Sequence, residues 1–183
     1  MATLTYLMTT SIDGFTTGPD GEFDWAMPTP AAHRHAQELV SRLAGEIYGP
    51  RMWETMRVWE DIRPGDGADF GELTEAMYDY GELWRSMPHH VFSRAEGKPL
   101  TGEILRELKA STQGELSISG PGLAAVALRE GEVDEVGRYI VPHATGGGTQ
   151  WWPEGLEAEL ELIAHEHVDA GWIYLRYRVT KTA

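Results

Sequence analysis

Two kinds of apolar pattern take turns along the chain, one typical of β-strands and the other typical of α-helices. Short apolar or alternating runs predict strands at residues 4–8, 46–48, 90–93, 116–119 and 138–142. Between these runs, apolar positions recur every three or four residues, which predicts helices. Strands and helices that alternate in this order are typical of an α/β protein whose sheet is mostly parallel.

The ends of these helices carry recognisable capping residues. Thr29 followed by Pro30 is typical of an N-cap and the first helical position, and we expect Gly45 to end this helix. Another helix begins after Gly49, and Thr101 caps a later one. A further helix carries its apolar stripe at five positions: Phe70, Leu73, Met77, Tyr80 and Trp84.

The last part of the chain predicts an antiparallel β-hairpin. Residues 160–167 and 172–179 alternate on either side of a turn at residues 168–171. Large side chains occupy both faces of the second strand, and Trp151 and Trp152 precede the hairpin. Both faces together carry more large side chains than a single buried face needs, so we expect a second copy of the chain to cover the other face in a homodimer. The alternative is that helices of the same chain cover the second face.

Composition narrows the class of protein. A length of 183 residues favours one domain over residues 1–183. The net charge of −14 argues against binding to nucleic acids or acidic membranes. The absence of cysteine excludes disulfides and zinc–sulfur sites, and His165 and His167 lack a third ligand, so we expect no metal. The first 15 residues resemble neither a signal peptide nor a membrane span, so we expect a cytoplasmic protein.

The segment from Leu116 to Ala125 combines a strand, a glycine turn and the first turn of a helix. This order leaves backbone N–H groups free at a helix N-terminus, where a phosphate can bind, and glycine lets the backbone approach a ligand closely. The spacing also matches the dinucleotide motif G-x-G-x-x-A, but the motif lies late in the chain and lacks an acidic residue about 20 residues later. A turn without a ligand is the alternative, and this motif alone favours that alternative.

Several other polar residues are candidates for chemistry, each with a structural alternative. Asp13 can polarise or protonate a substrate, or it can form an Asp-Gly turn after the first strand. Asp24 and Trp25 follow a glycine-rich stretch and belong either to a mobile lid over the substrate or to a plain surface loop. Arg51 and Arg94 can pair with an anionic ligand in this acidic chain, or they can remain solvated.

Five motifs occur in an order that extends over nearly the whole chain. They are Ser11-Ile12-Asp13-Gly14-Phe15, Gly49-Pro50-Arg51-Met52-Trp53-Glu54-Thr55-Met56, Val91-Phe92-Ser93-Arg94, Ser119-Gly120-Pro121-Gly122-Leu123, and Val133-Asp134-Glu135 followed by Pro142 and Gly146-Gly147-Gly148-Thr149. Their order, with the terminal hairpin, resembles the dihydrofolate-reductase-like fold and, within it, the reductase domain of riboflavin biosynthesis. The resemblance implies a three-layer α/β fold with a mostly parallel central sheet and an antiparallel C-terminal hairpin.

The resemblance also implies a function and assigns residues to it. It implies an NADP(H)-dependent reductase, with the cofactor across the carboxyl edge of the sheet and supplying the hydride. Nine residues would bind the cofactor: Gly49, Arg51, Met52, Ser93, Arg94, Gly120, Pro121, Gly122 and Leu123. Asp13 would be catalytic. Six residues would contact the substrate or form a lid over it: Ser11, Ile12, Gly14, Asp24, Trp25 and His33.

Two departures from the family pattern bear on cofactor and substrate. Pro50 stands where the family usually has arginine and Met52 where it has threonine, so we expect NADPH and leave NADH open. Residues 29–35 offer no carboxylate for a pterin, which argues against a folate substrate. The expected substrate is a small heterocyclic or ribosylamino-pyrimidine-like molecule, as for 5-amino-6-(5-phosphoribosylamino)uracil reductase. The alternatives are a noncatalytic nucleotide-binding module and a flavin- or pterin-using relative.

Overall fold

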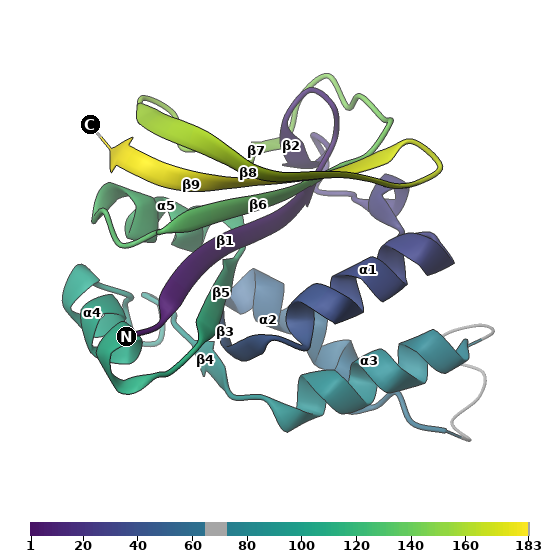
Figure 1. Ribbon diagram of the computed structural model, residues 1–183, viewed down its shortest axis with the longest axis horizontal. Helices are drawn as coiled ribbons and strands as arrows, with labels where there is room; N and C mark the ends of the chain where they lie inside the picture. Colours follow the sequence, from purple (N-terminus) through teal and green to yellow (C-terminus); the bar gives the residue numbers. More distant parts are fainter. Residues whose placement is uncertain (65–72, 183) are drawn as a thin grey trace.

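A seven-stranded sheet forms the centre of the computed structural model, which describes residues 1–64 and 73–182 (Figure 1). The strand order is β4-β3-β5-β1-β6-β9-β8. The parallel strands are β1 (Thr3–Thr10), β3 (Leu43–Tyr48), β4 (His89–Val91), β5 (Glu115–Ser119) and β6 (Glu135–Ile140). The antiparallel strands are β8 (Ala158–Asp169) and β9 (Trp172–Thr182). The predicted parallel sheet with an antiparallel C-terminal hairpin is confirmed.

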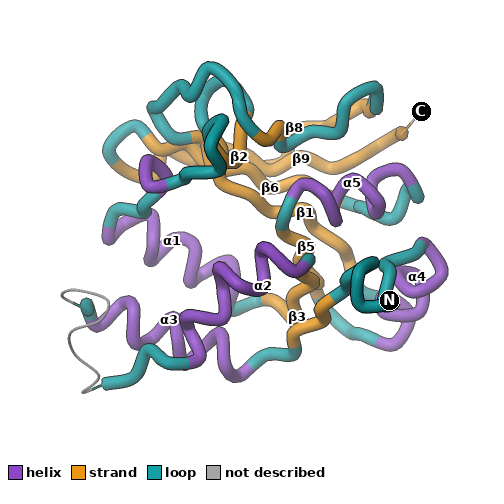
Figure 2. Tube along the Cα trace, turned by 180° about the vertical axis from the view of Figure 1, so that it is seen from behind, coloured by secondary structure: helices purple, strands orange, loops and turns teal. Residues whose placement is uncertain are grey.

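Helices cover both faces of this sheet and so give three layers (Figures 1 and 2). They are α1 (Pro30–Val40), α2 (Pro50–Met56), α3 (Glu75–Ser86), α4 (Gly102–Ser111) and α5 (Pro121–Arg129), with 3-10 turns η1 (Asp24–Ala26) and η2 (Arg57–Glu60). The core on one face includes Leu105 of α4 and Ala124 of α5. Ala32 of α1 packs on the other face, and Trp84 of α3 lies in a third cluster that includes residues of α2. Within the described residues, no helix combines the length and the apolar composition needed to cross a membrane.

The first strand lies in the middle of the sheet and is covered on both sides. Leu4 and Tyr6 belong to the core beneath α4 and α5, whereas Leu7 packs on the side of α1. Alternate residues of a strand point to opposite faces, so a strand buried on both faces has apolar residues at odd and even positions. This explains why the first predicted strand is a nearly continuous apolar run.

Two predicted helix starts are confirmed by their capping contacts. The Thr29 hydroxyl oxygen accepts a hydrogen bond from the Ala32 N–H (3.1 Å) at the start of α1. The Thr101 hydroxyl oxygen accepts one from the Ile104 N–H (3.3 Å) at the start of α4. Each threonine therefore satisfies one N–H group that the helix itself leaves free.

The predicted end of the first helix at Gly45 is wrong. The helix α1 ends at Val40, and Gly45 lies inside strand β3. A Cβ atom at Gly45 would lie 3.2 Å from the Pro88 carbonyl oxygen and 3.3 Å from a methyl carbon of Leu116. Glycine here serves the close approach of neighbouring segments, and it does not stop a helix.

Several strand boundaries also differ from the prediction. Strand β6 begins at Glu135, before the predicted start at residue 138, so Arg138 lies in the interior of the strand. The strand predicted at residues 90–93 spans His89–Val91. Two short strands that were not predicted, β2 (Phe15–Thr17) and β7 (Thr149–Gln150), pair with each other. Phe70, which we placed in a helical stripe, lies outside the described residues.

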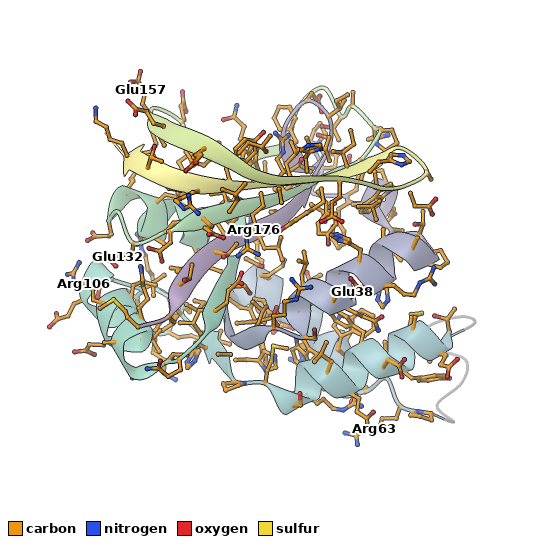
Figure 3. All side chains as sticks on the ribbon, in the orientation of Figure 1. Glu38, Arg63, Arg106, Glu132, Glu157 and Arg176 are labelled. Carbon is orange, nitrogen blue, oxygen red and sulfur yellow. The ribbon has the colours of Figure 1, made fainter. Side chains whose placement is uncertain are left out.

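A charged side chain of β9, Arg176, is partly buried in the molecule (Figure 3). Its guanidinium contacts the Glu115 carboxylate at 2.8 Å and the Glu135 carboxylate at 2.5 Å. A partly buried cation with two carboxylate partners is electrostatically satisfied, so Arg176 serves the fold.

Candidate functional site

The carboxyl ends of the parallel strands gather most of the predicted site residues. Parallel strands β1, β3, β4 and β5 all end at the same edge of the sheet. The residues that follow these ends include Ser11, Gly49, Ser93 and Gly120. Open α/β sheets bind ligands outside this edge, and the observed topology therefore brings residues from four distant segments to one place.

Two glycine turns at this edge lie against each other. A Cβ atom at Gly49, the N-cap of α2, would lie 3.8 Å from the Cβ of Leu123 in α5. A Cβ at Gly120, the N-cap of α5, would lie 3.5 Å from the Cβ of Met52 in α2. Figure 2 shows the amino ends of the two helices side by side. The predicted cofactor residues of these two motifs therefore form one surface.

The amino end of α5 is suited to an anion. Gly120 has φ 92° and ψ 120°, a backbone conformation that favours glycine. No side chain among the described residues caps α5, in contrast to the threonine caps of α1 and α4. The N–H groups of Gly122 and Leu123 lie in the first turn, where a helix provides no acceptor, and the space beside Gly122 is open. A phosphate group fits these properties.

Ser93 and Arg94 lie beside the same edge. The Phe92 N–H donates to the Tyr48 carbonyl oxygen (3.0 Å), which holds this segment next to the end of β3. Ser93 is buried and exchanges two backbone hydrogen bonds with Lys98, both 2.8 Å. Arg94 is exposed, and no carboxylate of the described residues pairs with it. Arg51 of α2 is likewise exposed, so both arginines are accessible to an anionic ligand.

Asp13 lies in the turn at residues 11–14 that follows β1. Its carboxylate accepts hydrogen bonds from the backbone N–H groups of Gly146 (2.8 Å) and Thr145 (3.2 Å). A hydrogen bond from the Ser11 hydroxyl, together with these two N–H groups, lowers the pKa of the Asp13 carboxyl. Asp13 is therefore ionised at neutral pH. It can fix the loop at residues 143–148 and polarise a neighbouring group, but it is poorly suited to donate a proton.

The other residues of this turn have separate environments. The Ser11 side chain is buried, and its hydroxyl oxygen accepts a hydrogen bond from the Phe15 N–H (3.0 Å). Ile12 is 65% exposed. Gly14 has φ 90°, and a Cβ atom there would lie 3.6 Å from the Trp151 ring. The turn therefore presents one apolar side chain to solvent and packs its glycine against an indole.

Arg138 contacts this turn, and the sequence interpretation missed it. Its Nε donates to the Thr10 hydroxyl oxygen (2.7 Å), and an Nη donates to the Ser11 carbonyl oxygen (3.3 Å). The guanidinium carbon lies 4.7 Å from the centre of the Trp151 ring, within the range of a cation–π contact. A cation in the interior of an apolar strand is a recognisable signal. We overlooked this signal because the predicted strand began at Arg138.

His33 and Trp25 lie on the side of α1. The His33 ring is 5.6 Å from the Trp59 ring, and its Nδ1 is buried without a hydrogen-bond partner in the described part of the chain. Burial lowers the pKa of His33, which favours its neutral form. Trp25 lies in η1 and stacks on His143 with ring centres 5.3 Å apart, while Asp24 beside it is exposed. Trp25 therefore lies beside the turn at residues 11–14, because the Ile12 N–H donates to the His143 carbonyl oxygen (2.8 Å). His33 instead packs against Trp59 and Tyr80.

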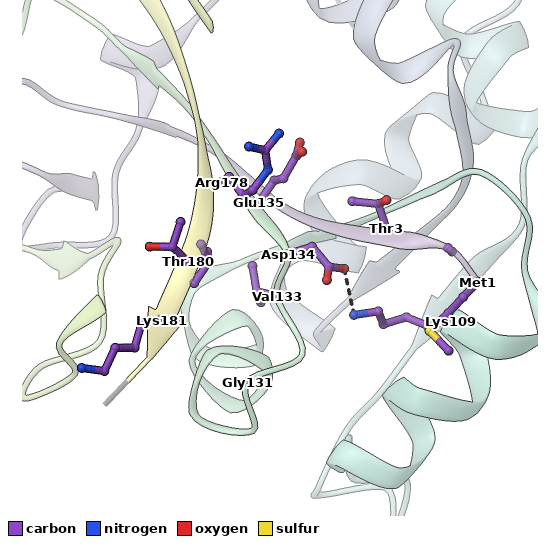
Figure 4. A pocket seen from close by; sticks show the side chains of 12 residues that line it. Met1, Thr3, Lys109, Gly131, Val133, Asp134, Glu135, Arg178, Thr180 and Lys181 are labelled. Carbon is purple, nitrogen blue, oxygen red and sulfur yellow. Dashed lines mark ion pairs between the residues drawn. The ribbon is translucent and has the colours of Figure 1, made fainter. Parts of the chain in front are cut away.

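A hollow of about 570 Å³ lies at the opposite, amino-terminal edge of the sheet (Figure 4). Its lining includes Lys109, Asp134 and Arg178. The Lys109 ammonium contacts the Asp134 carboxylate at 2.8 Å, and Arg178 contacts the Glu161 carboxylate at 2.7 Å. Because these charges are already paired and none of the predicted site residues lines the hollow, we place the functional site at the carboxyl edge.

Comparison with known proteins identifies the fold. The sequence matches no protein-family model and no curated protein. A protein from Shewanella sp. PV-4, provisionally assigned to riboflavin biosynthesis, has 19% identity and a TM-score of 0.68, over 99% of this chain and 100% of that chain. RibD from Acinetobacter baumannii has 18% identity and a TM-score of 0.67, over 98% of this chain and 58% of RibD.

Dihydrofolate reductase from Enterococcus faecalis, complexed with NADP(H) and RAB-propyl, has 15% identity and a TM-score of 0.55. That match covers 98% of this chain and 97% of the reductase. The dihydrofolate-reductase-like fold that the motifs predict is therefore confirmed.

Proposed function

We propose that residues 1–183 form one reductase domain that transfers a hydride from NADPH to a small heterocyclic or ribosylamino-pyrimidine-like substrate. The observation that carries this proposal is the contact between the two glycine turns, Gly49 with Leu123 and Gly120 with Met52, at the carboxyl edge of the sheet. The fold supports it, since the same architecture occurs in a dihydrofolate reductase complexed with NADP(H).

The chain offers a separate group for each part of the cofactor. The first turn of α5, with Gly120, Gly122 and Leu123, would hold the pyrophosphate through backbone N–H groups. Arg51 and Arg94 would hold the 2′-phosphate, which distinguishes NADPH from NADH. When bound, the cofactor supplies the hydride, and the protein binds, orients and polarises. Of the two roles expected for Asp13, its low pKa supports polarisation over proton donation.

We expect NADPH to stabilise the protein and Arg94 to select it over NADH. Saturation at about 100 times the dissociation constant adds about 2.7 kcal/mol to the free energy of unfolding. That gain raises Tm by roughly 5–10 °C in a chain of this size. A charge-assisted hydrogen bond contributes about 1.5–3 kcal/mol. Arg94→Ala should therefore weaken NADPH binding by about 10- to 150-fold and leave NADH nearly unchanged, as measured by calorimetry.

Arg42→Ala is the matched control, because Arg42 is also exposed but precedes β3 at the opposite edge. It should leave the affinity for both nucleotides unchanged. A Tm that does not respond to millimolar NADPH would contradict the cofactor assignment. An equal loss of NADPH and NADH affinity in Arg94→Ala would show that Arg94 does not contact the 2′-phosphate. NADPH binding without turnover of any heterocycle would favour the noncatalytic module, which the departures at Pro50 and Met52 also favour.

We further propose that the protein is a homodimer formed through the β8–β9 hairpin. Strand β8 lies at the edge of the sheet. Leu160, Leu162 and Ile173 are 38%, 49% and 41% exposed, and their strand register places them on one face of the hairpin. Several exposed aliphatic side chains on one face of a hairpin are typical of a protein–protein interface.

Light scattering at micromolar concentration should give twice the 20.4 kDa mass of one chain. Leu162→Glu should shift the protein to the monomer, because a carboxylate would be buried in the interface without a partner. Ser111→Glu is the control, since Ser111 is exposed at the end of α4, a helix outside the hairpin. A wild-type mass near 20.4 kDa would rule out the dimer.

A further inference from the structure

Four apolar side chains, which we name the lid patch, lie in the two segments that we assign to the substrate or to a lid over it: Ile12, Phe23, Trp25 and Met27. Ile12, Phe23 and Met27 are 65%, 42% and 68% exposed. Phe23 and Met27 flank η1, which carries Trp25. Large apolar side chains that are so exposed are uncommon within one short segment, and together they are suited to cover an apolar ligand.

Contacts with His143 join the two halves of the lid patch. The Ile12 N–H donates to the His143 carbonyl oxygen (2.8 Å), and the Trp25 ring stacks on the His143 ring. Trp25 also packs against the cluster that contains Ala32 of α1. The lid patch therefore extends from the end of β1 to the first turn of α1, the region in which we place the substrate.

The two segments that surround the lid patch carry carboxylates but neither lysine nor arginine. Residues 11–33 contain four carboxylates, Asp13, Asp20, Glu22 and Asp24, and neither lysine nor arginine. Residues 141–152, which contact this segment, contain no charged residue apart from the titratable His143. His33 is held in its neutral form by burial, which lowers its pKa. The two segments that surround the substrate side therefore lack a cation for a phosphate.

The nearest arginine on the sheet, Arg138, is occupied by other contacts. Its Nε and one Nη donate to Thr10 and Ser11, and the Trp151 ring covers its guanidinium. The exposed arginines Arg51 and Arg94 follow the ends of β3 and β4, in the segments that we assign to the cofactor. The site thus separates into a cationic half for the nucleotide and an apolar, anionic half for the second ligand.

We propose that the substrate is an uncharged planar heterocycle that carries no phosphate group, an inference that rests on the proposed reductase function. A phosphate brings nearly two negative charges, which here would meet the carboxylates of these segments, while Arg138 is already occupied by Thr10, Ser11 and Trp151. In the reaction, hydride adds to the carbon of a C=N bond and a solvent proton adds to the nitrogen, while NADPH becomes NADP⁺.

A matched pair of probes tests this inference. We would titrate the NADP⁺-saturated protein, and the protein without nucleotide, with 5-amino-6-(ribosylamino)uracil and with its 5′-phosphate, by calorimetry. Repulsion from the nearby carboxylates, screened by salt, should weaken binding of the phosphate by about tenfold relative to the unphosphorylated compound. The difference should shrink as ionic strength rises from about 50 to roughly 500 mM.

Two variants separate a local effect from the overall charge of the chain. Asp24→Asn should reduce the discrimination, whereas Glu107→Gln, the same change on the exposed face of α4, should not. Phe23→Ser should weaken the binding of both compounds by a similar factor. Equal or tighter binding of the phosphate, or no binding of either compound, would overturn the inference. The change in Tm with NADPH measures nucleotide binding separately. A protein that does not bind the nucleotide would overturn the reductase function.

Discussion

Replacing Gly120 with alanine should weaken NADPH binding by about 100-fold and lower the free energy of unfolding by about 1–3 kcal/mol. Gly120 has φ 92° and ψ 120°, which alanine adopts only with strain. The substitution creates no clash, because the new Cβ would lie 3.5 Å from Met52. The backbone is instead expected to turn away from this conformation and to remove the N–H groups of Gly122 and Leu123 from the phosphate. Calorimetry and urea denaturation would measure the two effects.

Gly131→Ala provides the matched control for this prediction. Gly131 follows α5 at its other end and has φ 69°, and a Cβ atom there would meet open space. Alanine at this position carries a similar backbone strain of about 1–2 kcal/mol but lies away from the nucleotide. We expect Gly131→Ala to lose stability and keep its NADPH affinity. If both variants lost affinity equally, the effect at Gly120 would reflect stability alone, and the phosphate assignment would fail.

Glu46→Gln should abolish a loss of stability that the natural protein suffers at alkaline pH. Glu46 is 4% exposed in β3, accepts a hydrogen bond from the Tyr48 hydroxyl, and lies 3.5 Å from the Ser117 hydroxyl. Burial raises the pKa of Glu46 to about 7. His89 lies 3.7 Å away, but burial lowers the pKa of His89, so the two do not form a strong ion pair.

The sign of the effect follows from the protons bound in each state. The folded protein holds a proton on Glu46 up to a pKa of about 7, whereas the unfolded chain releases it near 4.5. The stabilisation is therefore complete below pH 4.5 and is lost as the pH rises through 7. The loss amounts to about 3 kcal/mol, since one pKa unit corresponds to about 1.36 kcal/mol.

Urea denaturation at about pH 5, 7 and 9 would measure this dependence. Glutamine keeps an oxygen acceptor for Tyr48 and cannot ionise, so Glu46→Gln should exceed the natural protein in stability at alkaline pH and differ little at acidic pH. Glu157→Gln changes an exposed carboxylate (Figure 3) and should show no such pH-dependent difference. A stability difference between Glu46→Gln and the natural protein that is the same at both ends of this range would contradict a buried neutral acid.

Local signals predicted most of the elements but not the short pairings between them. The threonine caps at Thr29 and Thr101 act on N–H groups three residues away, so the sequence contains the whole interaction. The pairing of β2 with β7 joins two very short strands that are far apart in the sequence, and neither has a periodicity of its own. Gly45 misled the prediction because a glycine that ends a helix and one that admits a neighbouring strand look alike in sequence.

The same distinction between local signals and contacts across distant segments applies to the candidate site. The glycine turns at Gly49 and Gly120 could be found because each follows a strand and begins a helix. The contact between these two turns could not be predicted from the sequence, because it depends on the order of strands in the sheet. The bonds from Asp13 to the loop at residues 143–148 and the contact of Arg138 with Trp151 are likewise made across distant segments.

The central position of the first strand has a consequence for folding kinetics. Tyr6 pairs with Ile118 on one side and with Val136 on the other, so both neighbours of β1 come from the second half of the chain. Closing such long loops must precede the gain from the contacts, which slows folding compared with helical proteins. The N-terminal half alone would leave both edges of β1 without a partner. The amides of β1 should therefore exchange with deuterium only when the whole sheet opens.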